Sequence, residues 1–131
     1  ALLPEQPAGR AKTLQAINVV DNYTYDPLIT RTFVQRAMVP MLGGQTDEAM
    51  IEGAKSECER AVSALDAMLA GQDYFGGDSA SLADFHVVPV MHYASQIPEG
   101  QALLGSASAL AAWLERMNTR DSVSSTVPSM G

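Results

Sequence analysis

The stretch Ser81-Leu82-Ala83-Asp84-Phe85-His86-Val87-Val88-Pro89 contains the clearest helix-start signal in the sequence. A serine followed three residues later by an acid forms a capping box. In it, the Ser81 hydroxyl accepts from the third helical amide, and the Asp84 side chain accepts from the serine amide. Pro89 removes one backbone hydrogen bond inside this helix and is expected to bend it. Three apolar side chains follow on one face, namely Phe85, Val88 and Met91.

Apolar residues recur at helical spacing in four further stretches, on both sides of this box. Alternation of apolar and polar residues, which would indicate strands, is absent. The sequence therefore predicts an all-α fold, a bundle of about five helices. The four stripes are Leu14, Ile17 and Val20; Ile29, Phe33, Ala37 and Pro40; Ile51, Ala54, Cys58, Ala61, Leu65 and Met68; and Leu110, Trp113, Leu114 and Met117.

Proline and glycine predict where these helices break. Asp26-Pro27 indicates a kink or a restart, because Asp can cap a helix and Pro suits the first helical position. Gly43-Gly44 ends that run, and the Thr46 hydroxyl is expected to cap the next helix. Pro98-Glu99 is expected to end the helix that the capping box begins, with only a short turn around residues 102–104 after it.

The length of 131 residues, of which 47% are apolar, predicts one compact domain over residues 1–131. Its polar tail, from about residue 122 to 131, is expected to be mobile. No apolar run approaches the roughly 20 residues that a membrane span needs. The chain begins with Ala1 and shows no signal-peptide pattern. We therefore expect it to be a piece of a longer protein.

Charge and cysteine content exclude several classes of function. The net charge is −7, and the 8 basic residues are scattered, which disfavours nucleic acid and anionic membranes as partners. The single cysteine, Cys58, cannot form an internal disulfide; this fits a cytoplasmic location, and its place in an apolar stripe predicts a core side chain. His86 and His92 are six residues apart, too far to share one helical face, so no metal site is predicted.

No catalytic constellation emerges from the residues. Ser81 and His86 diverge on a helix, and the capping box already explains Ser81 and Asp84, so a nucleophilic triad is not expected. One feature is less ordinary. The second half of the long N-terminal helical run has a second apolar stripe, which makes Val34 and Met38 candidates for lining an apolar pocket or an inter-domain groove, with ordinary core packing as the alternative. This stripe consists of Thr30, Val34, Met38 and Met41.

The capping-box stretch, preceded by Tyr74-Phe75-Gly76-Gly77-Asp78, resembles the signature segment of the C-terminal helical domain of glutathione S-transferases. The match covers nearly the whole chain, and within the family the sequence is similar to those of the phi class and its bacterial relatives. Further segments in the family's order and spacing are Tyr25-Asp26-Pro27, Pro40-Met41-Leu42-Gly43-Gly44, Thr46-Asp47-Glu48 and Trp113-Leu114-Glu115-Arg116-Met117.

The resemblance implies a division of labour between two domains. An N-terminal thioredoxin-like domain, whose pattern is missing here, would bind glutathione and stabilise its thiolate. This domain would bind the hydrophobic electrophile. By position relative to Pro40, the family's pocket-lining residues fall on Val34 and Met38, with Thr30 one turn earlier. Val34 is small where relatives often have an aromatic ring, which implies a wider pocket. Asp84 is carried over as a structural cap, so no catalytic residue is assigned.

The resemblance also sets expectations for the whole protein. It implies a cytoplasmic, homodimeric enzyme of detoxification with no cofactor, for which glutathione is a co-substrate. The chain alone is expected to be inactive. The alternative is a non-catalytic interaction module, because similar helical domains are appended to translation factors and synthetases. In that case Val34 and Met38 would belong to a protein-binding face. The sequence does not specify the electrophile.

Overall fold

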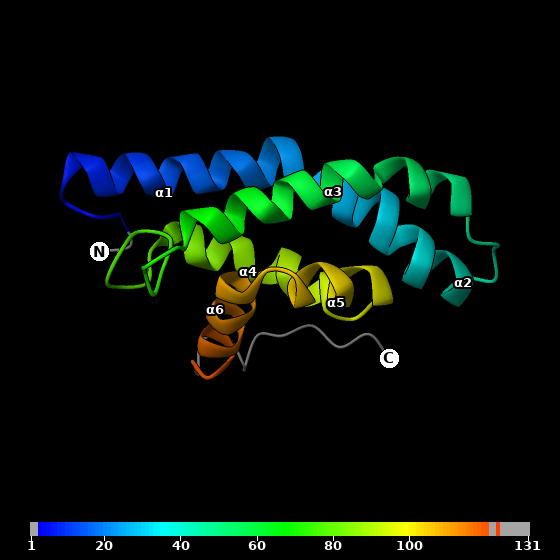
Figure 1. The fold of residues 1–131 in the computed structure, drawn as a ribbon. Helices are drawn as coiled ribbons and strands as arrows, with labels where there is room; N and C mark the ends of the chain where they lie inside the picture. Colours follow the sequence, from blue (N-terminus) through cyan, green and yellow to red (C-terminus); the bar gives the residue numbers. More distant parts are fainter. Residues whose placement is uncertain (1–2, 121–122, 124–131) are drawn as a thin grey trace.

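The computed structural model describes residues 3–120 and residue 123. Over these residues the chain is helical, and its only strand-like pairing is an isolated bridge between Tyr74 and Gly77. Figure 1 shows the long N-terminal helical run lying along α3, with the shorter helices against one side of this pair. The elements are α1 (Pro7–Val19), η1 (Val20–Met38), α2 (Val39–Met41), α3 (Glu48–Met68), α4 (Leu82–Ala94), α5 (Pro98–Gly105) and α6 (Ser108–Asn118).

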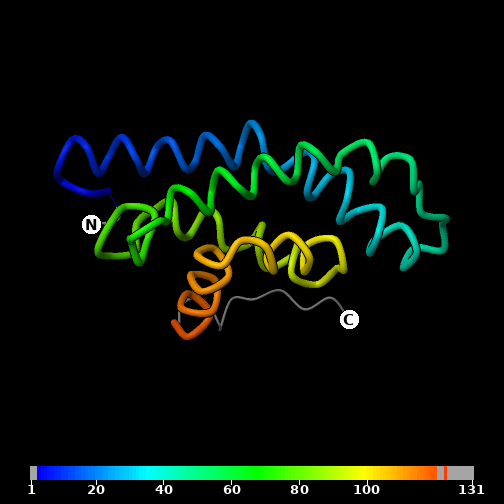
Figure 2. Tube along the Cα trace, viewed as in Figure 1, coloured from blue at the N-terminus to red at the C-terminus, as the bar shows by residue number. Residues whose placement is uncertain are grey.

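Of the kink or restart predicted at Asp26-Pro27, the restart does not occur, because α1, η1 and α2 follow one another without a break. η1 is a π-helix, whose wider turns bond each amide to the carbonyl five residues back, and it contains Pro27. The hydroxyl of Thr32 donates to the Pro27 carbonyl at 2.8 Å, and that of Thr24 donates to the Val19 carbonyl at 2.9 Å. The run changes direction within η1 (Figure 2).

Asp47 caps the N-terminus of α3, whereas the sequence predicts that the hydroxyl of the preceding residue, Thr46, caps it. The Asp47 carboxylate accepts from the Met50 amide at 3.1 Å. Thr46 instead donates its hydroxyl proton to the carbonyl of Gln35 at 2.8 Å, and the Gln35 side chain accepts from the Asp47 amide at 2.8 Å. Thr46 therefore ties the loop before α3 to η1 rather than starting the helix.

The short turn expected around residues 102–104 is also wrong, because this segment lies in the helix α5. Pro98 occupies its first turn, where the missing amide proton costs nothing. Gly100 is buried against the end of α4: a Cβ atom added there would lie 1.8 Å from the carbonyl oxygen of Ala94. The two helices approach this closely because Gly100 has no side chain.

Helix α4 lies at the centre of the fold. It packs against α1, η1, α5 and α6, and it continues through Pro89 to Ala94. The described helices form five continuous segments, so the predicted all-α bundle of about five helices is confirmed. Within the described residues, no helix is long and apolar enough to span a membrane. The tail predicted to be mobile lies outside the described residues, apart from Val123, which is buried in the core.

Candidate functional site

The two apolar stripes of η1 have different surroundings. Ile29 and Phe33, from the first stripe, are buried in the core. In the second stripe Val34 is half-buried, while Thr30 and Met38 are exposed, Met38 by 37%. The structure thus places these three side chains one turn apart along η1, on a side that other described elements leave uncovered. Their predicted role in a substrate pocket stays a prediction.

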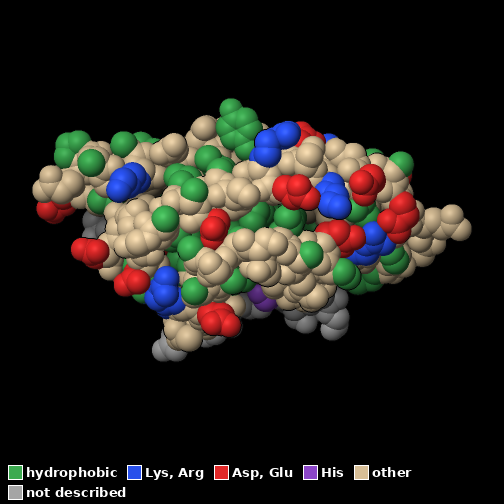
Figure 3. Space-filling view, viewed as in Figure 1, with side chains coloured by type: hydrophobic (Ala, Val, Ile, Leu, Met, Phe, Trp, Pro, Cys, Tyr) green, Lys and Arg blue, Asp and Glu red, His purple; other side chains and the backbone are tan. Residues whose placement is uncertain are grey.

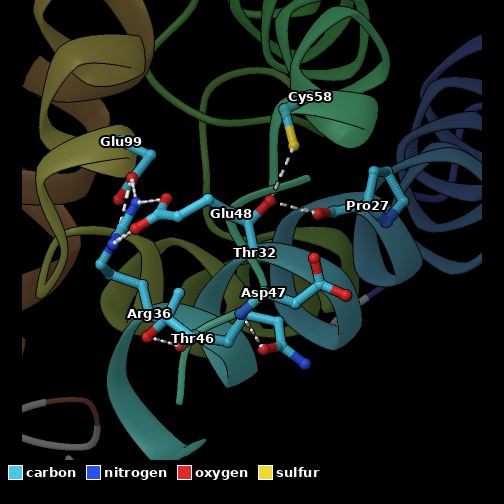
Figure 4. Close-up of polar contacts among 9 residues, drawn as sticks. Pro27, Thr32, Arg36, Thr46, Asp47, Glu48, Cys58 and Glu99 are labelled. Carbon is cyan, nitrogen blue, oxygen red and sulfur yellow. Dashed lines mark hydrogen bonds and ion pairs between the residues drawn. The ribbon is translucent and has the colours of Figure 1, made fainter. Parts of the chain in front are cut away.

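An arginine clamp fixes the end of η1 that carries Val34 and Met38. The Arg36 guanidinium bonds Glu48 at the start of α3, with distances of 2.7 and 2.8 Å to its two carboxylate oxygens. It also bonds Glu99 in α5, at 2.9 Å from Nε and 2.8 Å from Nη2 (Figure 4). These hydrogen bonds raise the pKa of Arg36, with that to Glu48 contributing most, and Arg36 lowers the pKa of Glu48 in turn. One side chain therefore joins three helices.

A second arginine links the middle of η1 to α3. Arg31 Nη2 bonds the Glu57 carboxylate, and Arg31 Nε lies 3.0 Å from Asp26 Oδ2. The pKa of Arg31 is raised mainly by the hydrogen bond to Glu57. Burial has the second-largest effect and acts in the opposite direction, lowering the pKa. Such charge-assisted contacts to a planar guanidinium restrict the rotation and sliding of one helix on the other.

Cys58 is a core side chain, as its position in an apolar stripe predicts. Its side chain is 3% exposed, and Sγ lies 3.8 Å from the Thr32 hydroxyl of η1 (Figure 4). Burial raises the pKa of the Cys58 thiol, and the contact with Thr32 partly opposes this shift. The thiol therefore stays protonated near neutral pH and lacks the character of a nucleophile.

The capping box is present and forms part of a larger buried network. Asp84 is 0% exposed, and its Oδ2 accepts from the amide of Ser81 at 2.7 Å and from the Ser81 hydroxyl at 2.9 Å. Its Oδ1 accepts from the Phe75 amide at 3.0 Å and from the Trp113 indole at 2.8 Å. Asp84 therefore joins α4, the preceding loop and α6, which supports its predicted structural role.

The histidines do not gather at a site. His86 Nε2 lies 2.7 Å from Asp21 Oδ1, which links α4 to the start of η1 on the surface. His92 lies near Gln96, four residues further along the chain. Among the described residues, no group of three or more His, Cys, Asp or Glu side chains could hold a metal ion.

A five-segment helical bundle whose central helix starts at a buried Ser-x-x-Asp box is the architecture of a glutathione S-transferase C-terminal domain. The family model described as glutathione S-transferase, C-terminal domain, matches residues 25–121. The chain therefore belongs to this family.

Plant glutathione S-transferases are among its relatives. One from Hyoscyamus muticus is 31% identical over 74 residues, which are 56% of this chain and 35% of that protein. Glutathione S-transferase F11 from Arabidopsis thaliana is 29% identical over 122 residues, 91% of this chain and 55% of that protein. The chain thus spans about half the length, or less, of these curated relatives.

Solved structures agree with the fold. The apo form of a glutathione S-transferase III has a TM-score of 0.86 at 25% identity, covering 99% of this chain and 60% of that one. Glutathione S-transferase I from maize, in complex with an atrazine glutathione conjugate, has a TM-score of 0.81 at 27% identity, covering 95% of this chain and 58% of that one.

Proposed function

We propose that this chain is the hydrophobic-substrate domain of a glutathione transferase that conjugates glutathione to hydrophobic electrophiles. The observation that carries the proposal is the partly exposed stripe of Thr30, Val34 and Met38 on η1, in a chain that belongs to this family. The maize relative was solved in complex with an atrazine glutathione conjugate, which supports a hydrophobic compound joined to glutathione as the kind of ligand that we propose.

In the proposed reaction with an aryl halide, the glutathione thiolate attacks the carbon that bears the halogen. A carbon–sulfur bond forms, the carbon–halogen bond breaks, and the halide ion leaves. Lowering a thiol pKa from about 8.5 requires a nearby donor or a positive dipole, which a glutathione-binding domain would supply. Val34 and Met38 would hold the electrophile against the thiolate and exclude water from it, which is a contribution of proximity rather than of proton transfer. Glutathione is then a co-substrate, and no other cofactor is required. The Arg36 clamp keeps the two side chains in place.

The test is a conjugation assay of the full-length gene product with a panel of aryl halides and other electrophiles. Met38→Ala is expected to raise KM for the electrophile about threefold to tenfold, because part of an apolar contact is lost, and to leave KM for glutathione unchanged. Met50→Ala is the matched control, because Met50 on α3 is 39% exposed against 37% for Met38. Equal kinetics for the two variants would refute the assignment of Met38.

The width of the pocket has its own test. Val34→Phe adds a ring in the proposed pocket, so larger electrophiles should lose kcat/KM relative to smaller ones.

The isolated 131-residue chain should show no conjugation. A full-length product that is folded, binds no glutathione and conjugates nothing would instead favour the interaction module. The same preparation tests a two-fold dimer by ultracentrifugation, and cell fractionation tests the cytoplasmic location. Loss of tolerance to the same electrophiles when the gene is deleted tests a role in detoxification.

A further inference from the structure

A groove of about 430 Å³ lies on the side of η1 away from the Val34 stripe. Thr32 and Arg36 face it, two residues along from Thr30 and Val34, and residues two apart on a helix point in nearly opposite directions. The other walls are the first half of α3 and the start of α5. The volume falls within the roughly 300–1,000 Å³ typical of small-molecule sites.

The floor of the groove is apolar. Ile51 and Cys58 of α3 form part of it and are buried, and Leu103 of α5 adds a partly buried side chain. A ligand needs an apolar body to displace water from these surfaces favourably. The groove therefore favours an aromatic or aliphatic skeleton over a purely polar molecule.

The rim is acidic. Four glutamates and two cations line the groove, which gives these residues a net charge of −2. The charge of Arg36 is taken up by Glu48 and Glu99, so Lys55 alone faces the two remaining glutamates, Glu52 and Glu59. Figure 3 shows acidic and basic side chains alternating over the end of the molecule where α2 and α3 lie. The net charge of the chain, −7, adds to the attraction of cations.

From this apolar floor and acidic rim we propose that the groove between η1, α3 and α5 binds a small amphipathic amine, an apolar skeleton carrying one ammonium group. The skeleton lies on Ile51, Cys58 and Leu103, and the ammonium lies at the rim near Glu52 and Glu59. This site is separate from the proposed electrophile pocket and does not depend on glutathione transfer.

The experiment titrates the 131-residue chain with three probes of equal skeleton: phenylbutylamine, phenylbutanol and phenylbutyrate. Binding is measured by calorimetry, and its place by amide shifts in a ¹⁵N–¹H spectrum. The amine is expected to bind about tenfold more tightly than the carboxylate at low salt, with the alcohol between them, because two net charges lie within one Debye length of the site. The shifts should centre on Cys58 and Leu103.

Two sets of variants, expected to change the affinity for the amine in opposite directions, test the role of the charge at the rim of the groove. Glu52→Gln with Glu59→Gln brings the net charge of the lining to zero without touching the Arg36 clamp, and should weaken amine binding about fivefold. Lys55→Gln should strengthen it, an effect that partial unfolding would not produce. The matched control is Glu5→Gln with Glu115→Gln, which changes the total charge equally at exposed positions outside the groove.

A bulky side chain introduced in the wall of the groove tests whether the amine binds there. Ala102 is an exposed alanine in the wall of the groove, and Ala112 is an exposed alanine on α6 outside it. Ala102→Trp should abolish amine binding and Ala112→Trp should preserve it, with circular dichroism confirming that both are helical. The proposal is overturned if no probe binds, if amine and carboxylate bind equally, or if Ala102→Trp binds like the unmodified chain.

Discussion

Asp84 is a buried carboxylate whose hydrogen-bond donors, within the described part of the chain, are all neutral groups. Its two oxygens instead accept four hydrogen bonds, from Ser81, Phe75 and Trp113. Donors arranged in this way replace the water that a carboxylate loses on burial. Asp84 therefore does more than complete the capping box. It joins the start of α4, the loop before it and α6.

Replacing Asp84 should consequently destabilise the fold by more than the loss of a helix cap. A lost cap costs about 0.5–2 kcal/mol, whereas each buried donor left without a partner costs about 1–3 kcal/mol. We expect Asp84→Ala to lower the free energy of unfolding by about 3 kcal/mol or more, measured by urea denaturation. Asp78→Ala, at an exposed position in the neighbouring turn, should change it little. Similar losses in the two variants would contradict the network.

The raised pKa of Cys58 predicts how stability changes at alkaline pH. The unfolded chain releases its thiol proton near the ordinary value of 9.0, while the folded chain holds it to higher pH because of burial. Cys58 therefore makes no pH-dependent contribution below that value and destabilises the fold as pH rises past it. The gap in unfolding free energy between the unmodified chain and Cys58→Ala should shrink from pH 7 to pH 10. A constant gap would contradict the raised pKa.

At the scale of elements, local signals predict helix starts better than they predict continuity. The box at Ser81 and Asp84 determines where α4 begins, because both partners lie within one turn. Pro27 suggests a break by the same local logic, but wider helical turns accommodate it within η1. Pro98 indicates the end of one helix by its position in the sequence, although a proline suits the first turn of a helix equally well. Whether such a proline ends one helix or begins the next depends on how the segment packs against α4. A local sequence pattern carries no information about that packing.

Gly100 provides the test of that packing. Gly100→Ala would place a Cβ against the Ala94 backbone, which cannot move without shifting α4. We expect a loss of about 2–4 kcal/mol in unfolding free energy, comparable to other core overpacking or backbone effects. Gly53→Ala is the control: nothing lies within 4 Å of a Cβ at this exposed position in α3. It should stabilise the chain by about 0.5–1 kcal/mol. A tolerated Gly100→Ala would contradict the close approach.

The candidate sites differ in how far the sequence could reveal them. The spacing of Val34 and Met38 separates them from the core stripe of Ile29 and Phe33, and the burial of these residues agrees with that division. Arg36 has its partners 12 and 63 residues away. Nothing in the local sequence distinguishes it from any other surface arginine, so the clamp and the groove beside it emerge only from the folded chain.

At the scale of the whole molecule, one hydrophobic cluster connects every helix longer than one turn. It includes Val20 and Phe33 of the N-terminal run, Leu65 of α3, Met91 of α4 and Trp113 of α6. α5 adds Leu103 and Leu104, which are partly buried against it. Because the cluster is continuous, no group of the described helices has a core of its own. The chain should therefore unfold as a single cooperative unit.

The single tryptophan makes this cooperativity measurable. Trp113 is fully buried, packs edge-on against Phe75 at 5.1 Å between ring centres, and lies far along the chain from η1. Its fluorescence reports on α4 and α6, while far-ultraviolet circular dichroism reports mainly on the longer run from α1 to α3. In urea the two transitions should have the same midpoint and the same slope. Disrupting the clamp with Arg36→Ala should move both midpoints together. A dichroism transition at lower urea than the fluorescence transition would show that η1 and α3 unfold separately, and that the clamp rather than the shared core holds that end of the molecule.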